Sequence, residues 1–568
     1  MGDLGFLRSF GAFLAGIILF FHGSYGYSEK VPYYTFLKEA TSAPAVVHHD
    51  YIIIGGGTAS CPLAATLSQN ATVLVLERGG SPYGNPNIAN IANFVDLLSD
   101  TSATSPAQQF VSEDGVFNHR ARVLGGGSAV NAGFYSYASA AYVEKAGWNT
   151  TLVGESYEWV GKVVAFEPEV MAWQAAVRDG LLEVGVSPNN GFTYEHLHGT
   201  KIGGTIFDRR GHRHTAADLL RYADPRMIAV YLHATVHKIL FRYNPGRSRP
   251  EAYGVIYKDS NGIFHKAYLI NNSKNEIIVS AGALGSPQLL MLSGIGPAHH
   301  LQAHGIKVVI DQPMVGRGTA DNPMNILFIP SPIPVEVSLI QAVGIASFDS
   351  FIEAASGLSI TLPRLQSLSK YFEQFLNQTD QYFTRPSETI DVVTNSITIK
   401  GGVMLEKVDG PLSSGHLELK NTNPDDNPSV TFNYFKEPED LKRCVEGMRV
   451  VIDVVKSKAF SKFRYQNIPV QSLIDLVVKS PVNLRPRHVG ASFSLEQFCI
   501  DTVMTIWHYH GGCQVGRVVD NEYKVFGVDA LRVIDGSTFH VSPGTNPQAT
   551  VMMLGRYMGS RILHDRVS

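Results

Sequence analysis

The segment 51–60 constrains the fold of this chain more than any other part of the sequence. Four apolar residues, too few for a helix of their own, run directly into three glycines that end at Gly57, and the helix-compatible segment 62–69 follows. This is the order of a strand, a tight phosphate-binding turn and a helix whose N-terminus faces a pyrophosphate. A second apolar run ends at Glu77, where a carboxylate can accept hydrogen bonds from ribose hydroxyls. The sequence therefore predicts a Rossmann-like dinucleotide-binding fold.

Ser60 stands where this turn usually has a third glycine or an alanine, which allows the helix to pack closely against the strand. A serine is small enough to be accommodated, so we expect a weaker nucleotide site rather than none. The alternative interpretation is a glycine-rich turn in an ordinary α/β core. The strand, the turn, the helix and the spaced acid together favour the nucleotide site.

The length and composition of the chain indicate a globular enzyme of two domains. Its 568 residues exceed what one hydrophobic core normally covers, and 44% of them are hydrophobic while 17% are charged. The formal net charge of −3 gives no electrostatic reason to expect a nucleic-acid partner. We therefore expect a small-molecule substrate and no nucleic acid.

Residues 1–28 are typical of a cleavable secretory signal peptide. Arg8 precedes the apolar run 10–21, and small and polar residues follow. The run is short for a membrane-spanning helix, which needs about 20 apolar residues; an uncleaved anchor is the alternative. We expect no membrane span after cleavage and a secreted, extracellular glycoprotein of the cell wall or apoplast, with N-x-S/T sequons at Asn70, Asn149, Asn271 and Asn377.

Two further glycine-rich segments are suited to bring the backbone close to a ligand. Segment 120–133 contains three consecutive glycines, with Ser128 and Asn131 available for hydrogen bonds; a loop with a helix cap is the alternative. Segment 277–297 predicts a strand, a tight turn and a helix, for which Ser286 is the expected N-cap.

The C-terminal region adds a fourth element of this kind. A strand at 531–537 is followed by a helix that begins within 546–550. The N-terminus of a helix carries a partial positive charge of about half a unit, which suits an anionic ring or oxygen.

These four elements, in this order, resemble the glucose–methanol–choline (GMC) oxidoreductase family of flavoproteins. The resemblance covers nearly all of the chain after about residue 45, and segments 121–133 and 282–297 are similar to the two diagnostic motifs of the family. Three further segments are most similar to the plant HOTHEAD-like branch, which lies beside the mandelonitrile lyases: 427–435, 505–516 and 542–550.

The resemblance implies FAD as cofactor and an α/β fold in which a Rossmann-like FAD-binding domain is interleaved with an α+β substrate-binding domain. The FAD-binding domain would comprise residues 45–140, 226–325 and 500–568, and the substrate-binding domain residues 141–225 and 326–499. A disulfide between Cys444 and Cys499 is also implied, whereas spacing alone leaves the pairing of the four cysteines open.

The resemblance also implies which residues are catalytic and which contact FAD. His508, in a Trp-His-x-x-Gly context, matches the catalytic histidine, and Asn546 matches the second catalytic position. Val236 matches a backbone contact to adenine, and no metal is expected. The other residues expected to contact FAD, together with His508 and Asn546, are Gly55, Gly57, Thr58, Ala59, Glu77, Arg78, Val123, Gly127, Ser128, Asn131, Ala132, Gly133, Gly282, Trp507, Asp535, Gly536, Pro547 and Gln548.

Oxidation of an alcohol requires loss of the hydroxyl proton and transfer of a hydride to flavin N5. An imidazole with a pKa near 6.5 can accept the proton, and an amide can hold the oxygen in place. Together with the resemblance, this predicts FAD-dependent oxidation of a primary alcohol with His508 as the base, and the HOTHEAD-like branch implies a long-chain alcohol such as an ω-hydroxy fatty acid, or an aromatic one. O2 is one candidate electron acceptor. His510 and His214 are expected to be structural, the latter beside a capping box at 215–218.

Two alternatives stay open. A hydroxynitrile (mandelonitrile) lyase uses the same fold and bound FAD without redox turnover, and its histidine base removes the hydroxyl proton of a cyanohydrin as cyanide leaves. The resemblance favours the oxidoreductase, because the second catalytic position of those lyases is histidine and this chain has Asn546. A flavin-binding wall protein without catalysis is suggested by Ser60 and disfavoured by the presence of His508 and Asn546.

Overall fold

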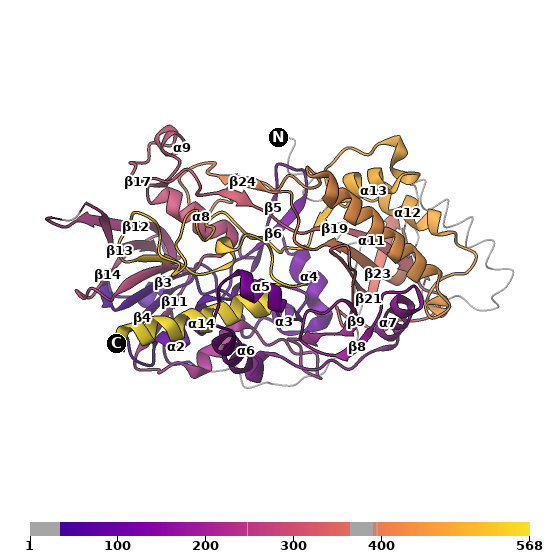
Figure 1. Ribbon diagram of the computed structural model, residues 1–568, viewed down its shortest axis with the longest axis horizontal. Helices are drawn as coiled ribbons and strands as arrows, with labels where there is room; N and C mark the ends of the chain where they lie inside the picture. The colour runs from indigo at the N-terminus through magenta and orange to yellow at the C-terminus, as the bar shows by residue number, and fades with distance from the viewer. Residues whose placement is uncertain (1–33, 247, 364–389, 394–395, 568) are drawn as a thin grey trace.

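The computed structural model describes residues 34–246, 248–363, 390–393 and 396–567. The predicted signal peptide and the sequon at Asn377 lie outside the described residues. Figure 1 shows two β-sheets along the long axis of the molecule, one on the left that contains β3, β4 and β11, and one on the right that contains β19, β21 and β23.

The left-hand sheet consists, in the described part of the chain, of six parallel strands in the order β1-β11-β4-β3-β15-β27. Every residue of β3 and β4 is buried, as expected for parallel strands covered on both faces. The predicted Rossmann-like sheet is therefore confirmed. Its strands are β1 (Leu37–Glu39), β3 (Tyr51–Ile54), β4 (Val73–Leu76), β11 (Ile228–Leu232), β15 (Glu276–Val279) and β27 (Leu531–Val533).

Two helices from distant parts of the chain pack together beside this sheet. α2 (Ser60–Leu67) follows the first glycine turn, and α14 (Gln548–Val567) follows β27. A Cβ atom at Gly555 of α14 would lie 2.0 Å from a backbone oxygen of the turn before α2. The hydroxyl of Ser60 is buried and donates to the Gly57 carbonyl at 3.1 Å. A glycine on the partner helix thus permits the close approach, and the serine is accommodated.

The helix after β15 begins earlier than predicted. α8 runs over Gly282–Leu292, so Ser286 is not its N-cap and Pro287 lies inside it. The Ser286 hydroxyl donates instead to the Asp535 carboxylate at 2.5 Å and accepts from the Ala281 N–H at 3.0 Å. A contact with a residue far along the chain determines the role of this serine.

The right-hand sheet contains eight strands among the described residues, and most of its pairings are antiparallel. The order is β26-β19-β23-β21-β20-β9-β8, and β22 also pairs with β23. The strands are β8 (Asn189–Phe192), β9 (Gly199–Ile202), β19 (Pro323–Pro330), β20 (Ala342–Ile345), β21 (Ser350–Pro363), β22 (Ile390–Val393), β23 (Ser396–Val408) and β26 (Met504–Thr505).

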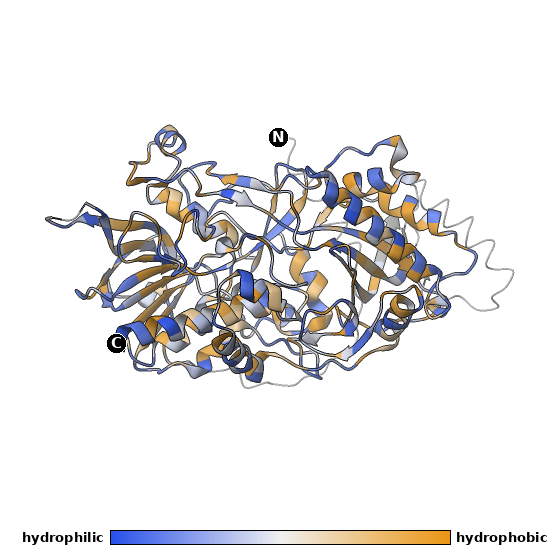
Figure 2. Cartoon of the chain, in the orientation of Figure 1, coloured by the Kyte–Doolittle hydropathy of each residue, from blue (hydrophilic) through white to orange (hydrophobic). Residues whose placement is uncertain are grey.

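The two faces of the right-hand sheet have different neighbours. Ile352, Ala354 and Met404 pack with apolar residues of four helices on one face, whereas Phe351 and Leu405 belong to a separate apolar cluster on the other. Figure 2 shows the helices at this end with alternating hydrophilic and hydrophobic stretches, as expected for helices with one buried side. These helices are α7 (Ala172–Glu183), α11 (Pro438–Lys456), α12 (Val470–Lys479) and α13 (Leu495–Thr502).

The remaining elements connect and cover the two sheets. A four-stranded sheet is formed by β2 (Val46–His49), β12 (Thr235–Tyr243), β13 (Pro250–Lys258) and β14 (Phe264–Leu269). The others are α3 (Pro86–Ala89), α4 (Phe94–Ser99), β5 (Ala107–Val111), β6 (Phe117–Ala121), β7 (Phe134–Tyr135), α5 (Ala140–Lys145), α6 (Thr150–Val164), β10 (Gly204–Thr205), β16 (Ile295–Gly296), α9 (Ala298–Ala303), β17 (Ile310–Asp311), β18 (Arg317–Thr319), β24 (Gly415–Glu418) and β25 (Ser429–Thr431), with short 3-10 helices between them.

Two local predictions are confirmed. Cys444 of α11 and Cys499 of α13 form a disulfide, with their Cα atoms 6.5 Å apart. Thr215 and Asp218 form the expected capping box at the start of a 3-10 helix, Ala216–Tyr222. The domain boundaries stay a prediction, although β1 enters the left-hand sheet before residue 45. Within the ranges that the structure describes, no helix is both long and apolar enough to cross a membrane.

Candidate functional site

A cavity of about 280 Å³ opens at the carboxyl ends of the parallel strands. Gly55 follows β3, Glu77 follows β4, Ser280 follows β15 and Asp535 lies two residues after β27, and all four line the cavity. Ligands of open parallel sheets bind at this edge, because the glycine turns and helix N-termini meet there. The fold therefore places a ligand site where the sequence predicts the nucleotide.

The structure brings the predicted cofactor residues together around this cavity. Val236 is the one predicted residue that does not line this cavity; it lines an adjoining one, which shares Gly55, Arg78, Arg120 and Ala281 with the first. The adenine contact predicted for Val236 thus concerns an adjoining space. The predicted residues in the wall of the main cavity are Gly55, Gly57, Thr58, Ala59, Glu77, Arg78, Val123, Gly127, Ser128, Asn131, Ala132, Gly133, Gly282, Trp507, His508, Asp535, Gly536, Asn546, Pro547 and Gln548.

The first two glycine clusters pack directly against each other. Gly126 has a φ of +57°, and a Cβ atom there would lie 2.7 Å from the Cα of Gly57. The Gly125 N–H donates to the Gly56 carbonyl at 2.7 Å. The glycines therefore allow two backbone segments to meet at the mouth of the phosphate-binding turn, which side chains would separate.

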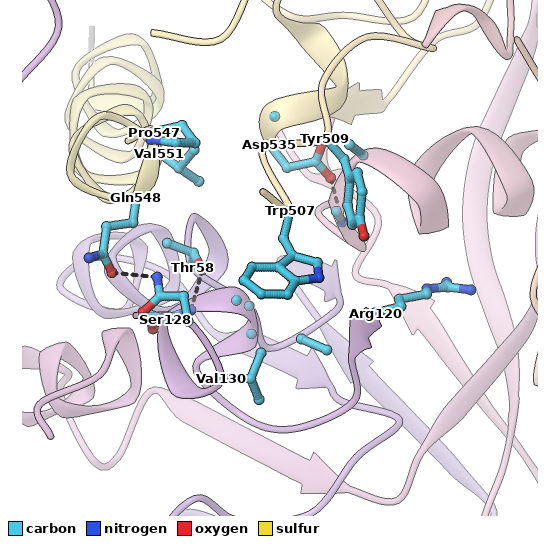
Figure 3. Close-up of a pocket in the computed structure, with 18 of the residues that line it drawn as sticks. Thr58, Arg120, Ser128, Val130, Trp507, Tyr509, Asp535, Pro547, Gln548 and Val551 are labelled. Carbon is cyan, nitrogen blue, oxygen red and sulfur yellow. Dashed lines mark hydrogen bonds between the residues drawn. The ribbon is translucent and has the colours of Figure 1, made fainter. Parts of the chain in front are cut away.

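The polar side chains beside these turns are fixed by one another. The Thr58 hydroxyl donates to the Gly125 carbonyl at 3.2 Å and accepts from the Ser128 N–H at 3.4 Å. The Asn131 amide donates to Gln548 Oε1 at 2.9 Å, which joins the second glycine cluster to the start of α14. Figure 3 shows the Trp507 indole within the cavity, with Thr58 and Ser128 on one side of it.

Glu77 is held in place by backbone groups. Its two carboxylate oxygens accept from the N–H groups of Gly56 and Gly79, each at 2.7 Å, and the residue is buried. Each oxygen can accept a second hydrogen bond. The carboxylate is thus oriented and retains the capacity to bind hydroxyl groups.

Asp535 joins the third and fourth predicted elements. Its carboxylate accepts from the Gly282 N–H at 2.9 Å and the Ser537 N–H at 2.8 Å, and burial raises its pKa. Gly282 has a φ of +81°, and no atom lies within 4 Å of the position that a Cβ would take. A ligand can therefore approach the backbone at the start of α8.

Several buried polar atoms in the cavity wall have no hydrogen-bond partner in the part of the chain that the structure describes. They are Arg78 Nη1, His119 Nδ1, Trp507 Nε1 and His508 Nδ1. An unpaired buried polar group is costly, and such groups in a cavity indicate a polar ligand. Together with the glycine-lined turns and the oriented Glu77, they fit a cofactor with ribose, phosphate and ring groups.

His508 lies in the same cavity wall in a form suited to accept a proton. It is 7% exposed, and burial, followed by the positive charge of Lys407 and by His510, holds its pKa well below the usual range. The imidazole is therefore neutral near pH 7, as a general base must be.

The backbone around His508 is held by Asp321. The Asp321 carboxylate accepts from the His508 N–H at 2.8 Å and from the hydroxyls of Thr505 and Tyr434, both at 2.6 Å. Burial raises the pKa of Asp321 to about 7. Trp507, just before His508, has a φ of +62°, which is strained for a residue with a side chain. Asp321 thus fixes a strained loop that presents the histidine.

His510 makes contacts within the loop that carries His508, and its structural role stays a prediction. Its Nδ1 contacts the His508 carbonyl at 2.9 Å, and its backbone pairs with Ala320. Cys513 is buried and is not among the residues that line the cavity.

The second predicted catalytic residue, Asn546, lies 8% exposed in the cavity wall just before α14. Its neighbour on the side of the large sheet is Glu353, which pairs with Lys407. Asp321, Glu353 and Lys407 were not predicted from the sequence as site residues. A pattern in the sequence could have pointed to Glu353 and Lys407, because each is a charged residue within an apolar strand. A buried charge requires a partner, so such a residue indicates a buried ion pair.

Comparison with known proteins identifies family models and relatives that match this chain. Family models described as GMC oxidoreductase match residues 49–324 and 411–555. The chain is 54% identical to the protein HOTHEAD of Arabidopsis thaliana over 533 residues, which cover 91% of this chain and 89% of that protein. It is 48% identical to an (R)-mandelonitrile lyase-like protein of the same plant, over 94% of this chain and 93% of that protein.

A third relative is named as an alcohol oxidase. The sinalpyl alcohol oxidase of Nesocodon mauritianus is 41% identical over 548 residues, which cover 94% of this chain and 92% of that protein. Among solved structures, pyridoxine 4-oxidase from Mesorbium loti superposes with a TM-score of 0.70 at 19% identity, covering 91% of this chain and 99% of that chain. That last likeness shows the shared fold.

Proposed function

The chain belongs to the GMC oxidoreductase family, FAD-dependent enzymes that act on CH–OH donors, and on that premise we propose that it oxidises a primary alcohol with His508 as the base. The observation that carries the proposal is a buried histidine of lowered pKa and an asparagine in one cavity wall with the glycine turns. A base and an oriented amide beside a cofactor site are what alcohol oxidation requires.

FAD would be held by the residues already described. Glu77 would accept from the ribose hydroxyls, and the glycine turns at Gly57 and Gly126 would let the pyrophosphate approach the backbone. The free N–H of Trp507 and the open backbone at Gly282 are available to the ring. When bound, FAD supplies the acceptor for the hydride.

The proton would be handled by the chain itself. We assign the imidazole of His508 as the group that takes the hydroxyl proton, since its Nδ1 has no hydrogen-bond partner among the described residues. Asn546 would hold the substrate oxygen, and positioning of the alcohol between these two side chains would supply much of the rate. Asp321 keeps His508 in place by accepting from its backbone N–H.

The residues of the cavity wall favour an apolar alcohol as the substrate. Its polar members gather at the turns, whereas Leu98, Val130, Phe134, Ile340 and Ile506 form an apolar part. An apolar wall with few polar groups favours an aromatic or long-chain substrate, including ω-hydroxy fatty acids. The naming of one relative as an alcohol oxidase supports the reaction.

A cyanohydrin lyase is the second candidate, because a protein named (R)-mandelonitrile lyase-like is 48% identical to this chain. In that reaction His508 would remove the hydroxyl proton of the cyanohydrin and cyanide would leave as an anion. The carbon–carbon bond breaks without net oxidation, so the two candidates differ in whether the cofactor is reduced.

An anaerobic experiment separates them. FAD-loaded protein is mixed in turn with ω-hydroxy fatty acids, benzyl alcohols and mandelonitrile, and the flavin absorbance at about 450 nm is followed. Bleaching by an alcohol, absent in His508→Ala, supports the oxidoreductase and names the substrate class. Release of benzaldehyde from mandelonitrile over an unbleached flavin assigns the lyase. Re-oxidation on admission of O2 tests oxygen as the acceptor.

We also propose that the protein is a secreted glycoprotein. The sequons at Asn70, Asn149 and Asn271 are exposed, as glycosylation requires. Expression of the full chain in plant cells, followed by recovery of the protein from the apoplast and a mass decrease on enzymatic deglycosylation, tests this. Retention inside the cell without a mass shift contradicts it.

A further inference from the structure

Two buried charged residues lie on the face of the large sheet that is turned toward the cavity. Glu353 on β21 and Lys407 on β23 have no exposed surface, and the Lys407 ammonium donates to Glu353 Oε2. Phe351 pairs with Lys407 across the two strands, so Glu353, two residues further on, projects from the same face. Phe351 belongs to the apolar cluster that also contains Ile340 of the cavity wall.

Stability alone does not account for an ion pair in this place. The removal of two charges from water is costly, and an apolar pair of similar volume generally gives equal or greater stability. The face around Glu353 and Lys407 is largely apolar, and another buried charge on it is Lys201 of β9, which pairs across the strands with Val343, the neighbour of Glu353. The contacts of the pair indicate a different role.

The second oxygen of Glu353 faces Asn546. In the amide orientation that satisfies its surroundings, the Asn546 NH2 group donates to Glu353 Oε1 at 2.8 Å and to the Thr545 hydroxyl at 3.0 Å. Lys407 contacts Oε2, so Oε1 is the oxygen that remains for the amide. Burial raises the pKa of Glu353, whereas the Lys407 and Asn546 donors favour its ionised form.

We propose that Glu353 is a positioning residue that fixes the side-chain amide of Asn546 in one of its two orientations, with Lys407 as its counter-charge. A free amide can turn by half a rotation and so exchange a donor for an acceptor. A carboxylate only accepts, so it selects the orientation in which the NH2 group points toward it. The inference rests on the proposed function, in which Asn546 holds the substrate oxygen.

The same ion pair also acts on the other residue of the site. Lys407 follows burial as the largest influence that lowers the pKa of His508, ahead of His510. The Asp321 carboxylate contacts the same loop by accepting from the His508 backbone N–H. Glu353 and Lys407 thus connect the large sheet to both Asn546 and His508.

The test compares two double variants of the FAD-loaded protein that both lack the ion pair. Lys407→Met with Glu353→Gln keeps a carbonyl oxygen at position 353 for the Asn546 amide. Lys407→Met with Glu353→Leu removes it. We expect kcat to be roughly tenfold lower in the Leu double variant than in the Gln double variant, with a much smaller difference in KM.

The same pair of substitutions is then made in an Asn546→Ala background. If Glu353 acts through Asn546, the tenfold difference in kcat disappears there, because no amide remains to be oriented. A difference of equal size in both backgrounds, or none in either, overturns the proposal. Failure of the proposed function is distinct, since Asn546→Ala and His508→Ala would then leave turnover unchanged.

A second variant and a second measurement distinguish loss of the Glu353–Asn546 contact from misfolding. Glu353→Asp keeps the charge opposite Lys407 but shortens the reach to Asn546, and we expect it to lower kcat only when Asn546 is present. Thermal unfolding of the cofactor-free proteins gives the coupling between positions 353 and 546 without any turnover. Additive shifts in Tm, which show that the two side chains do not interact, contradict the proposal.

Discussion

The two sheets contribute to the cavity in different ways. The parallel sheet supplies strand ends, and its contribution is mostly backbone: Gly57, Gly126 and Gly282 leave room for a ligand. The large sheet supplies a face, and its contribution is side chains, of which Glu353 and Lys407 are charged. The cofactor part of the site is therefore built mainly from backbone turns, whereas the catalytic part depends on side-chain contacts between distant segments.

The largest expected effect concerns the catalytic part. Removal of the base in His508→Ala should lower kcat by roughly 10³-fold while FAD stays bound, because the glycine turns are untouched. Steady-state kinetics and the bound flavin content measure the two quantities. His299→Ala, at an exposed position on α9, is the control and should change neither. Loss of FAD together with activity would show that the two parts of the site are not separable.

The loop that presents His508 should depend on one carboxylate. Asp321→Ala leaves a buried backbone N–H and two hydroxyls without their acceptor, so we expect the free energy of unfolding to fall by about 3 kcal/mol and kcat to fall with it. Urea unfolding measures the first quantity. Asp311→Ala, at an exposed residue, is the comparison. Equal stability in the two variants would show that Asp321 does not hold the loop that presents His508.

The contact between glycine turns can be tested by a single methyl group. Gly126→Ala places a Cβ 2.7 Å from the Gly57 backbone at a positive φ, and we expect FAD binding to weaken roughly tenfold or more. Gly147→Ala has a similar φ of +67° with no atom within 4 Å, so it reports strain alone. Gly147→Ala should lose about 1 kcal/mol of stability from strain, and Gly126→Ala should lose more because of the added clash with backbone. An unchanged Kd for FAD in Gly126→Ala would argue against this contact as part of the cofactor site.

The smallest expected effect is a shift along the pH axis. A lowered pKa means that the folded protein disfavours protonation of His508, so the base stays neutral as pH falls through the usual value of about 6.5. We expect kcat/KM to stay level there and to fall only at lower pH. A profile with an acid limb at or above pH 6.5 would contradict the buried, electropositive setting of the ring.

The sequence could predict the backbone part of the site because its signals are local. Gly57, Glu77 and Gly126 occur in short segments whose turn geometry follows from residue type, and the structure places them together. Local signals were misleading at Ser286, which has the type of an N-cap but is held by Asp535. The partners of Asp321 lie more than a hundred residues away, so no local pattern could show them.

The packing of α14 on α2 has a consequence for the order of events during synthesis. β27 and α14 are translated after the other strands of the parallel sheet, yet α14 covers the helix that follows the first glycine turn, and Asn546 lies just before it. A nascent chain that ends before residue 531 lacks an edge strand, the helix that buries α2, and Asn546 itself. Cofactor capture must therefore wait for these last residues to leave the ribosome.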